Sequence, residues 1–233
     1  MDVVLFDLFG TLVTYESDRA KLSFSRTAEL VVRHRDSQPR VPWFDVWDRE
    51  FVTLETLADE SGIEFSMDKV YANSVEELGL DPLDRDLGNA FVETFLFEWR
   101  QGVRKIPGVN EMLKRLVARN VRIGLVTNTH SEKLVTDVLG SCDLLALFEA
   151  RITSVQFGLR KPRPEIFLKA LEVLNVSASD TIFVGDSYLA DYVGAESVGV
   201  HAYLVAWGED VWADTVPSER KLMTVLDAES IVE

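Results

Sequence analysis

Four short stretches of the chain are rich in apolar residues, chiefly Val, Ile, Leu and Phe, without a regular alternation with polar ones, at residues 3–6, 121–127, 181–184 and 202–205. Apolar stretches of this kind are typical of parallel strands that are buried on both faces. A shorter strand is expected near Ile152. Apolar residues at helical spacing lie between these strands and predict helices at 109–119, 132–139, 164–174 and 188–197. The alternation of strands and helices predicts an α/β fold with a doubly wound parallel sheet.

The pattern between the first strand and residue 102 is different, because it is helical and poor in strands. It predicts helices at residues 19–35, 44–61, 67–78 and 83–99, and Ser66 is a candidate cap for the third. The strand at 3–6 has no strand neighbour before residue 121, so we expect it to join the later sheet. Residues 16–101 then form an inserted all-helical domain, and residues 1–15 with 102–233 form the sheet-containing core. Ligands of open parallel sheets bind beyond the carboxyl ends of the strands, so we expect the insertion to act as a lid.

Polar residues follow the core strands at the points where these strands end. Asp7 follows the first strand, Thr127 and Asn128 end the second, and Asp186 follows the third. Each of these residues alone has a commoner structural role, such as capping a turn. Together, at one edge of a sheet, they predict a catalytic site.

The residue types at this edge suit phosphoryl transfer. A carboxylate such as Asp7 can attack phosphorus and form an aspartyl-phosphate. Asp7 and Asp186 could hold Mg²⁺, which prefers oxygen ligands. Lys161, in a Pro-rich loop, and polar groups such as those of Thr11 and Asn128 could bind the remaining phosphate oxygens.

The net charge, the cysteine content and the apolar runs of the chain exclude several kinds of partner and protein. The 233 residues carry a formal net charge of −15, which disfavours binding to a nucleic acid backbone. A small phosphorylated substrate, the partner expected from the site residues, could still bind if a cation lies in the pocket. A single cysteine, Cys142, rules out an internal disulfide framework. No apolar run approaches the roughly 20 residues of a membrane helix, and no signal peptide is visible, so we expect a cytoplasmic protein without a membrane partner. The oligomeric state does not follow from these patterns.

Four motifs of the chain resemble those of the haloacid dehalogenase superfamily of hydrolases. They are "DLFGTL" from Asp7, "LVTNT" with Thr127, "RKPRPEIF" with Lys161, and "VGDSYLAD" with Asp186 and Asp191. The helical insertion also matches the position of the family's cap, so the resemblance spans the whole chain. It implies a Rossmann-like core with a mobile helical cap.

The resemblance also implies roles for individual residues. Asp7 would be the nucleophile, and Thr127 and Lys161 would bind the phosphate or the intermediate. Asp186 would be a metal ligand and Asp191 its supporting carboxylate. The backbone carbonyl of residue 9 is usually a further metal ligand in this superfamily, and Phe9 can supply it.

Phe9 departs from the common phosphatase pattern, which has a second aspartate two residues after the nucleophile. That aspartate protonates the leaving oxygen, and such help contributes about 10²–10⁴-fold to the rate. A phosphatase with Phe9 would use substrates with good leaving groups or take a proton from another residue, for which Tyr15, Glu16 and His130 are the nearest candidates.

Two other functions stay open on this pattern. Dehalogenases of the superfamily have an aromatic residue at this position and use no metal, so a 2-haloacid dehalogenase is the first alternative. Its halide-binding arginine has four candidates among the arginines of the insertion, and none of the four stands in a diagnostic context: Arg26, Arg35, Arg40 and Arg49. Phosphonate-cleaving relatives need a lysine in the cap, and the sequence around Lys21 and Lys69 does not identify either as that lysine.

A binding or regulatory protein with little turnover is the second alternative. We weight the Mg²⁺-dependent phosphatase most, because a buried Asp186 beside Asp7 would repel it unless a cation lay between them.

Overall fold

The computed structural model describes residues 2–35, 41–205 and 215–232. The chain divides into two compact units, one made of Met1–Tyr15 and Arg104–Glu233 and the other of Glu16–Val103. None of the helices in these described ranges combines the length and the apolar character that a bilayer-spanning segment needs. Arg40 lies outside the described residues.

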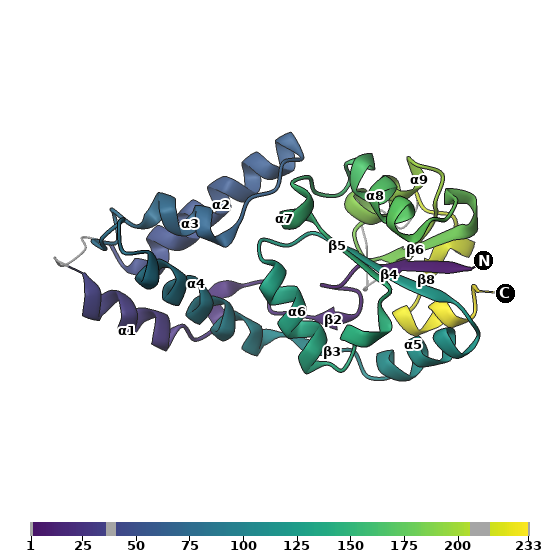
Figure 1. Cartoon of the computed structure of the whole chain (residues 1–233), viewed down its shortest axis with the longest axis horizontal. Helices are drawn as coiled ribbons and strands as arrows, with labels where there is room; N and C mark the ends of the chain where they lie inside the picture. The colour runs from purple at the N-terminus through teal and green to yellow at the C-terminus, as the bar shows by residue number, and fades with distance from the viewer. Residues whose placement is uncertain (1, 36–40, 206–214, 233) are drawn as a thin grey trace. The chain divides into compact units, whose positions relative to one another are not determined.

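The first unit contains a six-stranded parallel sheet in the order β5-β4-β1-β6-β7-β8 (Figure 1). The first strand of the chain lies in the middle of this sheet, where Val3 pairs with Arg122 on one side and with Thr181 on the other. The predicted α/β fold with a doubly wound parallel sheet is therefore confirmed. The strands are β1 (Val3–Phe6), β4 (Arg122–Thr127), β5 (Ala150–Thr153), β6 (Thr181–Gly185), β7 (His201–Val205) and β8 (Lys221–Leu222).

Helices cover both faces of this sheet, with α8 and α9 on one side and α5 on the other (Figure 1). Val3 and Leu5 of β1 pack in one cluster with Ile166 and Phe167 of α8, and all four side chains are fully buried. Burying such a side chain contributes about 1.5–3 kcal/mol, so the apolar run of β1 ties the middle of the sheet to this layer. The helices of this unit are α5 (Val109–Ala118), α6 (Glu132–Ser141), α7 (Ser154–Phe157), α8 (Pro164–Leu174) and α9 (Gly194–Glu196).

Short elements complete the first unit, and several of them differ from the sequence prediction. The two-residue strands β2 (Val13–Thr14) and β3 (Arg104–Lys105) form an antiparallel ribbon that the sequence pattern did not predict, and the same is true of β8. The expected single helix at 188–197 is a π-helix, η5 (Tyr188–Val193), followed by α9. The remaining elements are η3 (Leu145–Leu147), η4 (Ala178–Asp180), η6 (Ser218–Arg220) and η7 (Val225–Glu229).

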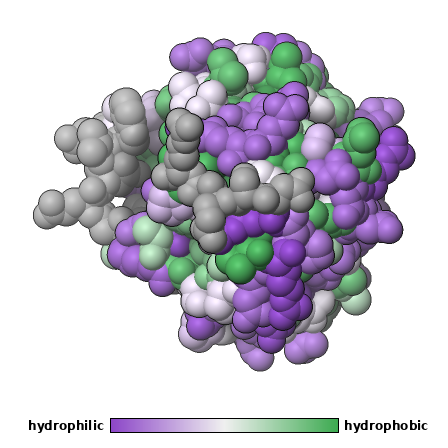
Figure 2. All heavy atoms as spheres, turned by 90° about the vertical axis from the view of Figure 1, so that its left-hand side faces the viewer, coloured by the Kyte–Doolittle hydropathy of each residue, from purple (hydrophilic) through white to green (hydrophobic). Residues whose placement is uncertain are grey.

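The second unit is helical and has an aromatic core. The fully buried ring of Trp47 lies 4.9 Å from the ring of Phe91 and 4.8 Å from that of Phe95, measured between centroids. On the face shown in Figure 2, apolar residues lie scattered among hydrophilic ones. The elements of this unit are η1 (Arg19–Lys21), α1 (Ser25–His34), α2 (Trp43–Ser61), α3 (Met67–Ser74), α4 (Arg85–Trp99) and η2 (Arg100–Gly102).

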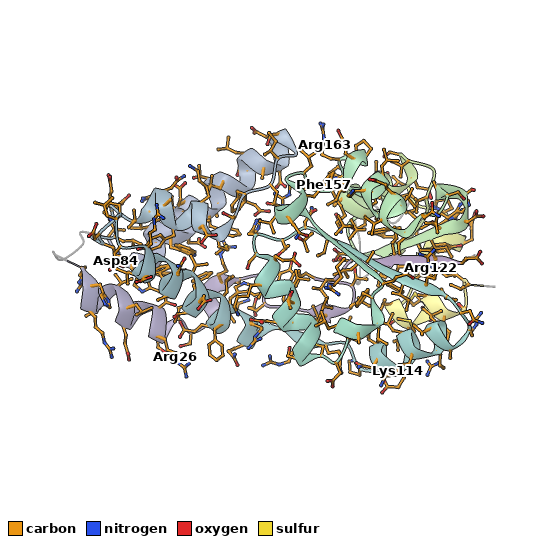
Figure 3. The ribbon with its side chains drawn as sticks, viewed as in Figure 1. Arg26, Asp84, Lys114, Arg122, Phe157 and Arg163 are labelled. Atoms are coloured by element: carbon orange, nitrogen blue, oxygen red, sulfur yellow. The ribbon has the colours of Figure 1, made fainter. Side chains whose placement is uncertain are left out.

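Two helix boundaries in the second unit depend on capping carboxylates and hydroxyls. Ser66 caps α3 as predicted, since its hydroxyl accepts a hydrogen bond from the Lys69 amide at 3.3 Å, but α3 ends at Ser74 and not at residue 78. The side chain of Asp84 caps α4 by accepting from the Leu87 amide at 2.9 Å, and Figure 3 labels its position.

The expected continuous helix at 19–35 is wrong, because the chain breaks between η1 and α1. The buried carboxylate of Glu98, from α4, accepts hydrogen bonds from the amides of Arg26 and Thr27 at 2.8 and 3.0 Å and from the Thr27 hydroxyl at 2.7 Å. These amides belong to the first turn of a helix and need an acceptor. A carboxylate that lies more than 70 residues away therefore fixes where α1 begins.

Candidate active site

The strand β1 delivers Asp7 to the carboxyl edge of the sheet. All four residues of β1 are buried, and the Asp7 amide continues the ladder by donating to the carbonyl of Val184 at 3.0 Å. The Asp7 side chain is itself buried, with 5% exposure of the residue. A carboxylate in this position is held rigidly by the backbone of the central strand.

A tight turn follows Asp7 and brings a glycine against a second carboxylate. Gly10 has a φ of +93°, and its amide donates to the carbonyl of Val13 at 2.7 Å. A Cβ atom at Gly10 would lie 2.2 Å from Oδ2 of Asp186. Only glycine allows both the backbone conformation and this approach.

The strand β6 ends at Gly185 and positions Asp186 and Asp191. The Thr11 hydroxyl donates to Oδ1 of Asp186 at 3.1 Å, and the Ser187 amide donates to Oδ2 of Asp191 at 2.9 Å. A Cβ atom at Gly185 would lie 2.4 Å from Cγ of Asp191, so this glycine also allows a carboxylate to approach the backbone. The π-helix turns the Asp191 side chain inward, where it is 2% exposed.

Lys161 joins two of these carboxylates from the loop between α7 and α8. Phe157 and Arg163, labelled in Figure 3, mark the two sides of this loop. The Lys161 ammonium donates to Oδ1 of Asp7 and to Oδ1 of Asp191, each at 2.6 Å, and all three groups are buried. Burial alone would lower the pKa of Lys161, but the two carboxylates outweigh it and raise the pKa above its ordinary value. Lys161 therefore stays charged.

The charges of the site do not balance among the residues that form it. One carboxylate oxygen from each of Asp7, Asp186 and Asp191 lies within 4.8 Å of the others. Among the described residues, the ammonium of Lys161 is the cation that the ion pairs of this group contain. Burial raises the pKa of Asp7 to about 6, with Lys161 opposing the rise and Asp191 adding to it. Burial and then the charge of Asp7 raise the pKa of Asp186 to about 7. A buried set of oxygen donors with excess negative charge fits a hard divalent cation.

Thr127 and Asn128 lie at the end of β4, the neighbouring strand. Thr127 is fully buried, and both ends of the Asn128 amide bind the backbone of Lys161. Its amide at the end of a strand made Asn128 a predicted substrate-binding residue, whereas its contact with the Lys161 backbone has no signal in the sequence.

The ring of Phe9 lies next to that of Tyr15. The two centroids are 6.0 Å apart and the ring planes make an angle of 81°, an edge-to-face contact. His130 directly precedes Ser131, whose hydroxyl caps α6 by accepting from the Leu134 amide at 3.2 Å. Ser131, the residue after His130, is thus the cap of α6.

The remaining sequence candidates belong to the helical unit. Glu16 accepts a hydrogen bond from the Asp18 amide at 3.0 Å. The guanidinium of Arg26 lies 5.1 Å above the ring of Phe97, and Arg49 pairs with Glu77 at 2.6 Å. Each of these contacts lies within the helical unit.

Comparison with known proteins agrees with the motifs. A family model described as haloacid dehalogenase-like hydrolase matches residues 1–199. The chain is 35% identical to haloacid dehalogenase-like hydrolase domain-containing protein 3 of Mus musculus over 120 residues, which are 50% of this chain and 47% of that relative, so the match spans about half of each.

Two further similarities extend over nearly the whole chain. Glyceraldehyde 3-phosphate phosphatase of Pyrococcus furiosus is 28% identical, over 98% of this chain and 94% of the relative. The crystal structure of 2-haloacid dehalogenase from Pseudomonas syringae pv. Tomato DC3000 has the same fold, with a TM-score of 0.70, 21% identity, and coverage of 100% of this chain and 98% of that one.

Proposed function

Because the chain belongs to the haloacid dehalogenase-like hydrolases, we propose that it is a Mg²⁺-dependent phosphatase that acts on a small phosphorylated metabolite. The observation that carries this proposal is the buried group of Asp7, Asp186 and Asp191, in which the Lys161 ammonium pairs with two of the three carboxylates. Three buried carboxylates repel one another unless a cation or a proton offsets the charge. The similarity to a phosphatase over nearly the whole of both chains supports a phosphorylated substrate.

In the proposed reaction, an oxygen of the Asp7 carboxylate attacks phosphorus, and the bond from phosphorus to the leaving oxygen breaks. Water then attacks the aspartyl-phosphate at phosphorus, which releases inorganic phosphate and regenerates the Asp7 carboxylate. Lys161 has three N–H bonds, of which two donate to Asp7 and Asp191. The third could donate to a phosphate oxygen, as could the Thr127 hydroxyl, in the transition state.

The metal-binding residues of this proposal are Asp7, the backbone carbonyl of Phe9, and Asp186. Mg²⁺ bound there would reduce the repulsion between the anionic nucleophile and the anionic substrate. Asp191 supports the group indirectly, because its two oxygens accept from the Lys161 ammonium and the Ser187 amide. Thr11 does the same for Asp186 through its hydroxyl.

A 2-haloacid dehalogenase is the second candidate, and Phe9 is the observation that favours it. The Phe9 ring lies against Tyr15 and offers no proton. Halide leaves carbon without taking up a proton, so a dehalogenase needs no acid at this position, whereas an alkoxide leaving group does. The role of the helical unit as a lid and the location in the cytoplasm remain predictions for either candidate.

A panel of phosphate esters assayed with Mg²⁺ and with EDTA tests the proposal, beside chloride release from 2-chloropropionate. We expect phosphate release that EDTA abolishes, that Mg²⁺ restores and that Asp7→Asn removes. Equal phosphatase activity with and without metal would disprove the metal-dependent mechanism. Chloride release without phosphate release would establish the second candidate in its place.

A further inference from the structure

The Asn128 side chain binds the backbone of one other residue at two points. Its Nδ2 donates to the carbonyl of Lys161 at 3.0 Å, and its Oδ1 accepts from the Lys161 amide at 2.8 Å. A primary amide has one acceptor oxygen and two N–H donors, so the oxygen and one donor serve the same partner. The pair of bonds fixes both the position and the orientation of the Lys161 backbone relative to the end of β4.

Asn128 is itself held in place by its neighbour in the chain. The Ser154 hydroxyl accepts from the Thr129 amide at 2.8 Å and donates to the Thr129 carbonyl at 3.2 Å, and both residues are buried. The residue that follows Asn128 is thus fixed to the end of β5 by the same two-point pattern. Little freedom is left for the Asn128 side chain to turn toward a substrate without losing Lys161.

The hydrogen bonds of Asn128 influence the nucleophile Asp7 through the side chain of Lys161. The Lys161 ammonium lies 2.6 Å from both Asp7 and Asp191, in a buried position. A displacement of the Lys161 backbone would therefore move the ammonium out of one contact or the other. At a catalytic site, a misplacement of about 1 Å can lower the rate by about 10²-fold.

We infer that Asn128 is a positioning residue that acts through Lys161, with Ser154 as its support. The inference rests on the proposed function, in which Lys161 binds the transferring phosphoryl group. It replaces the direct substrate contact that was predicted for Asn128 from its amide group at the end of a strand.

A double-mutant cycle tests this inference, with kcat and KM measured for phosphate esters that differ in their organic groups. We expect Asn128→Ala to lower kcat/KM by about 10²-fold, mainly through kcat, and by the same factor for every ester. In a Lys161→Met background, the same change should have less than about a threefold effect, because residues that act through one another are not additive. An equal loss in both backgrounds, or a loss that depends on the ester, would show direct substrate contact and overturn the inference.

A structural measurement keeps the inference testable if Lys161→Met does not fold or if no phosphate ester is hydrolysed. In a crystal structure of Asn128→Ala, the Lys161 ammonium should have left at least one of its two carboxylate contacts. Retention of both 2.6 Å contacts would refute the inference. Failure of the wild-type protein to hydrolyse any ester would instead refute the proposed function, which separates the two outcomes.

Ser154→Ala should give a smaller loss in the same direction, because it acts one step further from Lys161. Asn73→Ala and Ser141→Ala are matched controls, since each removes one side-chain hydrogen bond, to Glu50 and to the carbonyl of Val138 respectively. We expect both controls to retain wild-type kcat/KM. A loss in Ser154→Ala no greater than that in Ser141→Ala would exclude Ser154 from this role.

Discussion

Replacing Gly10 by alanine tests whether the close approach of the Asp7 turn to Asp186 is needed for activity. The new methyl group would lie 2.2 Å from Oδ2 and 2.7 Å from Oδ1 of Asp186. Non-bonded contacts of this kind have an optimum of about 3.5–4.0 Å, so the carboxylate must retreat by more than about 1 Å. Its hydrogen bond from Thr11, at 3.1 Å, would not survive such a shift.

The expected effect is a loss of metal affinity together with a loss of activity. A shift of about 1 Å in a catalytic group corresponds to about 10²-fold in rate, or about 2.7 kcal/mol of transition-state stabilisation. The assays are kcat/KM for an aryl phosphate over a range of Mg²⁺ concentrations and Mg²⁺ binding by calorimetry. We expect Gly10→Ala to need more Mg²⁺ for half-maximal rate and to stay below the wild-type rate at saturation.

Backbone strain alone would also lower the stability of this variant, and Gly158 provides the control. Gly158 has a φ of +91°, almost that of Gly10, but a Cβ atom there meets nothing within 4 Å. Both alanine variants should lose about 1–2 kcal/mol of stability from the left-handed backbone, and only Gly10→Ala should lose Mg²⁺ affinity. If the two variants have the same activity and the same affinity, the close approach to Asp186 is not needed and the reasoning is refuted.

Three other predictions concern the acid, the metal and the helical unit. Phe9→Asp should raise kcat/KM for alkyl phosphates by about 10²-fold, because it supplies a proton to the leaving oxygen. For aryl phosphates, whose leaving groups need no proton, kcat/KM should change little. An equal increase in kcat/KM for both classes of ester would contradict the role of the missing acid. Mg²⁺ affinity should fall about twentyfold between pH 8 and pH 6, because protons compete for Asp186, whose pKa is raised by burial to about 7, and for Asp7, with a pKa of about 6. Calorimetry at several pH values measures this change, and a flat profile would exclude these ligands. Glu98→Ala should lower the free energy of unfolding by about 2–4 kcal/mol in urea denaturation, because the first-turn amides of α1 lose their acceptor. The control Glu93→Ala, at an exposed position of the same helix, should change this free energy little, and a similar loss in both variants would refute the capping role.

The parts of the fold that the sequence predicts are those whose information is local. The run of four buried residues in β1, and the similar runs of β4 and β6, are readable because a strand buried on both faces must be apolar throughout. The strands β2 and β3 have two residues each, too few for any periodicity. The start of α1 depends on Glu98, whose place in space the local sequence does not contain.

The same distinction applies to the candidate site. The sequence predicts that Asp7, Thr127 and Asp186 lie close together, because each follows or ends a parallel strand and the carboxyl ends of neighbouring parallel strands lie at one edge of the sheet. The partner of Asn128 could not be predicted in this way, because it is a backbone segment reached through a loop. An asparagine that binds substrate and one that fixes a loop have the same sequence signature, and only the geometry distinguishes them.

The ribbon of β2 and β3 has a consequence for how this chain could be re-engineered. Val13 pairs with Lys105 and Thr14 with Arg104, in antiparallel register, so the chain leaves and re-enters the sheet-containing unit at adjacent positions. Topologically, the whole helical unit is the loop of a hairpin, and antiparallel strands can be joined by as few as two residues. The insertion is thus exchangeable: a tight turn or a foreign domain whose ends lie close together could replace it without changing the strand order of the sheet.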